Sequence, residues 1–117
     1  MSREMMEKAV RILDSKKAKD IKVIDISGLT TLGDYFIIAT GTSSTQVRAL
    51  AGEVEEQLKK DGYTGTMEGY DNTGWVLMDY KDIIVHIFYT EMREHYQLEH
   101  LWSDGIPVDI SDLLTRD

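Results

Sequence analysis

Apolar residues recur along the chain at two spacings, one typical of helices and the other typical of strands. In residues 3–17 and 43–61 they return every three or four positions, which predicts two amphipathic helices. The second helix carries the clearest apolar stripe, made of Val47, Leu50, Ala51, Val54 and Leu58. Ser43 or Ser44 can cap its N-terminus, and Gly62 follows the basic pair that ends it.

Five shorter segments have the length and the apolar pattern of strands. They are residues 21–26, 34–40, 65–69, 75–80 and 82–89. The second segment, DYFIIAT, is apolar almost throughout, which predicts a central strand buried on both faces. Short polar connections separate the last three segments, so these should be antiparallel neighbours.

A third helical pattern covers residues 90–102, and a short C-terminal appendage, residues 103–117, follows it. The order α-β-β-α-β-β-β-α predicts an α/β (α+β) fold, with a mixed five-stranded sheet and flanking helices. The passage from strand to helix to strand across residues 43–61 predicts a right-handed parallel crossover. Because the chain has one proline, no repeat and no linker, we expect residues 1–117 to form a single domain.

Composition narrows the classes of site and partner. The 117 residues include no cysteine, which excludes disulfides, thiolate zinc sites and cysteine nucleophiles. Thirteen basic against 21 acidic residues give a net charge of −8, which disfavours sequence-specific nucleic-acid binding and favours a basic partner, or plain solubility. No apolar run approaches the ~20 residues of a membrane span, and the N-terminus lacks a signal-peptide core. We therefore expect a cytoplasmic protein without a membrane partner.

The turn Gly41-Thr42-Ser43-Ser44 is the first candidate for chemistry. It joins a predicted strand to a helix N-terminus, where backbone amides can hold a phosphate. It has no Walker lysine and no dinucleotide fingerprint, and Glu68 stands alone where a magnesium site needs paired carboxylates. A glycine turn with a serine cap is the plainer interpretation, and a nucleotide-binding or nucleotidyltransferase-type enzyme is the alternative.

The three histidines, His86, His95 and His100, form no pattern typical of a metal site or a catalytic triad. The last two are five residues apart, so a helix turns them away from each other. The first lies in the apolar strand IIVHIFY, where a hydrogen-bonded histidine on a sheet face is the plainer interpretation. We expect no catalytic residue, no metal and no cofactor.

The stronger signal is aromatic and lies in residues 75–80 and 82–89. Alternation assigns one face to an ordinary core of Val76, Met78, Val85 and Ile87, with Tyr80 on the side of Val76 and Met78. The other face combines Trp75, Leu77, Asp79, His86 and Phe88. This mixture is enriched in protein–protein interfaces. Coverage of the same face by the predicted helix 90–102 is an equal alternative.

Several motifs resemble the ribosomal silencing factor family, also called the Iojap family. They are DYFIIATGTSS from Asp34, Glu68-Gly69, GWVLMDY from Gly74, DIIVHIF from Asp82, and REHYQLEHLW from Arg93. Their order and spacing together are specific to this family. The match to the family covers residues 6–102. The family's fold is similar to that of nucleotidyltransferases without known catalytic activity, so the resemblance implies a nucleotidyltransferase-like fold here.

The resemblance also implies a function. Family members bind the large ribosomal subunit through its ribosomal protein fourteen, block joining of the small subunit, and so repress translation when nutrients are scarce. An acidic domain suits such a basic protein surface. A homodimer of the free protein through an exposed apolar face is a further expectation.

Carried over residue by residue, the family's partner-binding surface implies a set of positions in this chain. They are Trp75, Leu77, Asp79, Tyr80, His86, Phe88, Arg93, Tyr96 and Glu99. We expect the tryptophan, the leucine and the phenylalanine to act as apolar anchors. Asp79 would accept a charge-assisted hydrogen bond from a partner Lys or Arg. The last three positions could equally brace the last predicted helix.

Overall fold

The computed structural model describes residues 2–28, 33–69, 75–89 and 105–114. The elements are α1 (Ser2–Ser15), β1 (Lys19–Asp25), β2 (Tyr35–Gly41), α2 (Ser44–Lys60), β3 (Thr66–Glu68), β4 (Trp75–Asp79), β5 (Ile83–Tyr89), β6 (Ile106–Pro107) and the 3₁₀ turn η2 (Ser111–Leu113). The first two helices and the first five strands begin and end within two residues of their predicted bounds. The predicted helix 90–102 lies outside the described residues. In the described part of the chain, no helix is long and apolar enough to cross a membrane.

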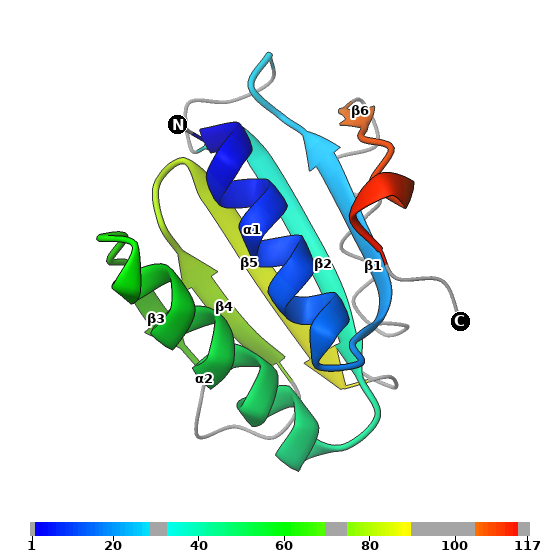
Figure 1. Ribbon diagram of the computed structural model, residues 1–117, viewed down its shortest axis with the longest axis vertical. Helices are drawn as coiled ribbons and strands as arrows, with labels where there is room; N and C mark the ends of the chain where they lie inside the picture. Colours follow the sequence, from blue (N-terminus) through cyan, green and yellow to red (C-terminus); the bar gives the residue numbers. More distant parts are fainter. Residues whose placement is uncertain (1, 29–32, 70–74, 90–104, 115–117) are drawn as a thin grey trace.

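The strands form one mixed sheet in the order β3-β4-β5-β2-β1-β6. β2 and β5 are parallel, and every other neighbouring pair is antiparallel. α2 carries the chain from β2 to the edge strand β3, and two antiparallel steps through β4 return it to β5 beside β2 (Figure 1). The mixed α+β architecture predicted from the sequence is confirmed.

The number of strands was predicted as five, whereas the described residues form a sheet of six. β6 pairs with β1 through Ile24 with Pro107 and Asp25 with Ile106. Two residues are too few to show an alternating pattern, and proline is common only on edge strands because it has no N–H to donate. The pairing therefore depends on β1, about 80 residues earlier, and local pattern does not reveal it.

Both helices lie on the same face of the sheet and pack side by side across it (Figure 1). The predicted stripe of α2 is buried in full. On α1, Met6, Val10 and Leu13 have no exposed surface. The sheet meets the helices with alternate residues, Val23, Ile37, Ala39, Val76, Met78, Val85 and Ile87. This is the main core.

The opposite face of the sheet carries a second buried cluster. It consists of Ile24, Ile26, Phe36, Ile38 and Phe88, with Trp75 packed against it. β2 is therefore buried on both faces, as its continuous apolar run predicted. Burial decreases toward the β3 edge: the side chains of Trp75 and Leu77 are half-buried, and Asp79 is exposed. The partly exposed side chains near the β3 edge are therefore the candidate site on this face.

Candidate functional site

The candidate site is the part of the sheet built by β3, β4 and β5, on the face away from the helices. In the antiparallel pairing of β4 with β5, Trp75 is opposite Phe88 and Leu77 is opposite His86. Glu68 on β3 pairs with Leu77 from the other side. Directly paired residues of neighbouring strands share a face of the sheet. The side chains that alternation placed together therefore do share one face of the sheet.

We call the accessible part of this surface the β4 face. It comprises Thr66, Glu68, Trp75, Leu77 and Asp79. Glu68 and Asp79 are exposed, and both adjoin the half-buried Leu77, one across the strands and the other along β4. The half-buried Trp75 lies on the other side of Leu77 from Asp79. The face thus offers two apolar side chains with acidic groups beside one of them, which is a composition that a basic protein surface complements.

Trp75 is fixed in place by the aromatic rings around it. Its ring lies 5.3 Å from that of Phe88, centroid to centroid, with 15° between the planes, and 5.8 Å from that of His86 with 23°. Its indole Nε1–H donates a hydrogen bond of 3.0 Å to Nδ1 of His86. The indole is therefore held by both stacking and a directional bond.

His86 lies beneath this tryptophan with 7% of its surface exposed. Burial lowers the pKa of its imidazole to about 4, so the ring is neutral at pH 7. An indole N–H can only donate, so Nδ1 must be the accepting nitrogen and the proton of the neutral ring is on Nε2. The plainer interpretation, a hydrogen-bonded histidine on a sheet face, is confirmed.

The predicted partner-binding residues are only partly brought together. Phe88 lies on the expected face but is fully buried, so it supports Trp75 from below and offers no surface of its own. Tyr80 lies on the other face, 6% exposed in the main core, where burial raises its pKa to about 12. Strand alternation turns it toward the helices, so it lies on the opposite face from the rest of the partner-binding set that the resemblance implied. Arg93, Tyr96 and Glu99 lie outside the described residues.

Sequence reasoning missed the contribution of β3. A pocket of about 260 Å³ opens between Glu68 and Gly69 on one side and Trp75 and Leu77 on the other. Gly69 has φ +83°, and a Cβ there would collide with the carbonyl oxygen of Trp75. Glycine thus allows the chain to pass close to β4. The β3–β4 register, with Glu68 opposite Leu77, is the signal that would have placed this carboxylate beside the aromatic centre.

The Gly41–Ser44 turn is occupied by contacts within the chain. Ser43 is the N-cap of α2, and its Oγ accepts from the backbone N–H of Gln46 at 3.0 Å. The Gln46 Oε1 accepts in return from the backbone N–H of Thr42 at 2.6 Å and from its hydroxyl at 2.9 Å. A Cβ on Gly41 would lie 2.9 Å from Cγ2 of Val47, so the glycine allows the helix to pack on the strand. These contacts match a capped turn.

Replacing Ser43 by alanine should lower the free energy of unfolding by about 0.5–2 kcal/mol, because the N–H of Gln46 loses its acceptor. Urea denaturation of the variant measures this loss. Ser44→Ala, one residue further along, is the control and should be nearly neutral. Equal stability of Ser43→Ala and the parent protein would contradict the cap, and nucleotide transfer that this change abolishes would favour the enzyme.

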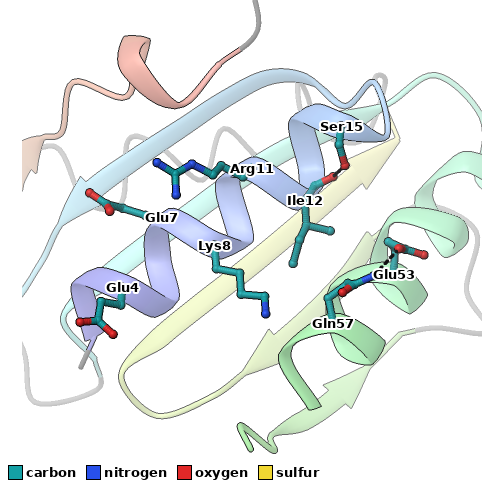
Figure 2. A pocket seen from close by; sticks show the side chains of 8 residues that line it. All are labelled: Glu4, Glu7, Lys8, Arg11, Ile12, Ser15, Glu53 and Gln57. Carbon is teal, nitrogen blue, oxygen red and sulfur yellow. Dashed lines mark hydrogen bonds between the residues drawn. The ribbon is translucent and has the colours of Figure 1, made fainter. Parts of the chain in front are cut away.

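A larger hollow of about 470 Å³ lies between α1 and α2, on the other side of the sheet. Its lining comprises Glu4, Glu7, Lys8, Arg11, Ile12, Ser15, Glu53 and Gln57. Lys8 and Ile12 extend toward α2, whereas Glu7 and Arg11 lie on the side of α1 away from it (Figure 2). Several lining groups bind within the protein: Lys8 pairs with Asp61, and Gln57 donates to Glu53 at 3.0 Å. The hollow is a solvated groove with charges of both signs.

Among the residues that the structure describes, no three His, Asp or Glu side chains gather as a metal site would need.

Comparison with known proteins gives a consistent result. All 117 residues match the family model RsfS, described as "Ribosomal silencing factor during starvation". The ribosomal silencing factor RsfS of Bacillus subtilis (strain 168) is 38% identical over 109 residues, which is 92% of each chain. A crystal structure of a protein from Chromobacterium violaceum has a TM-score of 0.86 at 38% identity, over 88% of this chain and 87% of that one. The mouse protein named mitochondrial assembly of ribosomal large subunit protein 1 is 32% identical over 99 residues, 80% of this chain and 43% of that protein.

Proposed function

The chain belongs to the ribosomal silencing factor family, and from that premise we propose that it represses translation by binding the large ribosomal subunit. It docks on ribosomal protein fourteen of that subunit and sterically blocks joining of the small subunit. The protein acts by occupancy, without turnover or a cofactor. The match over the full chain supports the silencing role, and the name of the mouse relative links the fold to the large subunit.

The observation that carries the proposal is the β4 face. A half-buried tryptophan and leucine with two exposed carboxylates beside the leucine is typical of an interface centre. The net charge of −8 repels ribosomal RNA, so an acidic protein approaches the particle at a basic protein patch. The half-buried apolar side chains and the negative net charge thus favour docking on a ribosomal protein over docking on ribosomal RNA.

In this arrangement each part of the β4 face has a separate role. The indole of Trp75 and the side chain of Leu77 lose water against the apolar stems of the partner. Asp79 and Glu68 accept from its Lys or Arg side chains at the rim, which steers the approach. Two copies of the chain would carry like charges at the same rim, so docking on a basic partner is favoured over pairing of the free protein.

The nucleotidyltransferase-type alternative has less support. Polar groups of Thr42 and Ser43 in the turn, where a phosphate would bind, already bond to Gln46. The glycine of the turn is explained by helix packing. We therefore assign the turn to the start of α2 and the function to the β4 face.

Co-sedimentation with purified ribosomal subunits tests the proposal. The protein should pellet with bacterial large subunits and stay in the supernatant with small subunits. Added before the small subunit, it should reduce the fraction of joined ribosomes in a sucrose gradient. Equal binding to both subunits, or binding to neither, would contradict the proposed function.

Asp79→Asn tests the acidic rim without disturbing the fold. The carboxylate oxygen Oδ1 accepts from the backbone N–H of Lys81 at 2.8 Å, and an amide oxygen can accept the same bond. Because the residue is exposed, losing its charge should weaken binding by about 0.5–1 kcal/mol, or two- to fivefold, and less at high salt. Co-sedimentation at two ionic strengths measures both effects.

Asp109→Asn is the matched control for that experiment. Asp109 is also exposed, and its Oδ1 also accepts from a backbone N–H two residues on, that of Ser111, at 2.9 Å. It follows β6, at the sheet edge opposite β3. Equal losses of binding in the two variants would show that net charge matters and that the β4 face does not.

A further inference from the structure

We infer that His86 is a positioning residue for docking, because its Nδ1 fixes the direction in which the Trp75 indole is presented to the partner. The inference rests on the proposed function, since the direction of the ring matters for binding only if the β4 face is the docking surface. His86 itself is 7% exposed and offers a partner little to touch.

Stacking and hydrogen bonding constrain the indole in different ways. The ring of Phe88, 15° from parallel at 5.3 Å, fixes the plane in which the indole lies. A stacked indole can still turn over within nearly the same plane, because two rotamers about its Cβ–Cγ bond are close in energy. The bond from Nε1 to Nδ1 of His86, 3.0 Å long, is available to one of these orientations. The hydrogen bond therefore selects a single presentation of the ring.

The acceptor is itself held rigidly. The imidazole lies 4.6 Å from the ring of Phe36 on β2 and 6.0 Å from that of Phe88 on its own strand. Its neighbours across the sheet are Leu77 on β4 and Ile38 on β2. A buried acceptor in fixed position, bonded to the half-buried Trp75, preorganises the surface before the partner arrives. Preorganisation strengthens binding because less freedom is lost on association.

The chemistry of the pair requires an acceptor at this atom. Tryptophan has no acceptor, so the bond exists only while Nδ1 carries no proton. A phenylalanine at position 86 would keep an aromatic ring in the cluster but would leave the indole N–H without its acceptor. An asparagine places its Oδ1 close to the position of Nδ1 and can accept the bond. These two substitutions separate ring packing from positioning.

The experiment compares four variants with the parent protein: His86→Phe, His86→Asn, Trp75→Phe and the double variant Trp75→Phe/His86→Phe. Binding is measured by co-sedimentation with purified bacterial large ribosomal subunits. The Trp75 indole N–H resonance is followed in ¹⁵N-labelled protein and is assigned by its loss in Trp75→Phe. Urea denaturation gives the free energy of unfolding of each variant.

We expect His86→Phe to weaken binding about five- to tenfold, the range of one lost hydrogen bond. It should also move the Trp75 indole resonance away from its hydrogen-bonded position, and His86→Asn should recover most of both effects. In the Trp75→Phe background, which lacks the donor, His86→Phe should have little further effect on binding.

Two results would overturn the inference while leaving the docking surface in place. One is parental binding by His86→Phe with an unchanged indole resonance. The other is that His86→Phe weakens binding as much in the Trp75→Phe background as it does in the parent protein. That result would assign the effect to packing. If His86→Phe does not fold, failure of His86→Asn to retain the hydrogen-bonded indole resonance overturns it. Parental binding by Trp75→Ala is a different result, because it contradicts the proposed docking surface itself.

Discussion

Replacing Phe88 by alanine should lower the free energy of unfolding by about 3–5 kcal/mol. The side chain is fully buried in the second cluster, between the side chains of β2 and the indole of Trp75. Truncation removes its apolar contacts and leaves a cavity that the paired strands β2 and β4 cannot close. Urea denaturation followed by circular dichroism measures the loss. A variant of parental stability would contradict the burial of this ring.

Phe88→Leu is the matched control, because it keeps most of the volume and should cost less than about 1.5 kcal/mol. Because leucine has no ring to stack on the Trp75 indole, this variant should bind large ribosomal subunits somewhat more weakly than the parent, although no partner reaches the buried side chain itself. A stable Phe88→Leu protein that no longer binds would return Phe88 to the role of an interface anchor, which the sequence predicted.

Strand alternation predicted which residues share a face, and the β4–β5 ladder confirms this for Trp75, Leu77 and His86. The same alternation placed Tyr80 on the core face, while the family resemblance placed it in the partner-binding set. The structure supports the alternation. A side chain's face follows from the backbone alone, with a period of two residues, so local pattern is a good guide to it.

The depth of burial could not be predicted in the same way. Phe88 lies on a strand flanked by β2 and β4, whereas Trp75 lies one strand closer to the edge. Nothing local to either strand encodes this difference, because it depends on the order of strands that are far apart in the sequence. The same reason explains why the pairing of β6 with β1 was missed. For Glu68 the strands β3 and β4 were predicted as neighbours, and only the register that places it opposite Leu77 was missed.

Trp75→Ala should have the largest effect on binding. The indole is the largest half-buried side chain of the β4 face and is held in one orientation, the two properties that interface hot spots share. Its removal should weaken co-sedimentation with large ribosomal subunits by about 2 kcal/mol or more, which is roughly 30-fold in the dissociation constant. The protein should still fold, with a smaller loss of stability than Phe88→Ala, because Trp75 is only half-buried whereas Phe88 is fully buried.

Tyr35→Ala is the matched control for this substitution. Tyr35 is also a half-buried aromatic residue, but it packs against the main core on the helix-covered face of the sheet. Its truncation should lower the free energy of unfolding and leave binding unchanged under conditions where the variant is folded. If Trp75→Ala behaves in the same way, losing stability but binding normally when folded, then the indole is a packing residue. The docking surface would then have to lie elsewhere on the molecule, because no other side chain of the β4 face offers comparable apolar area.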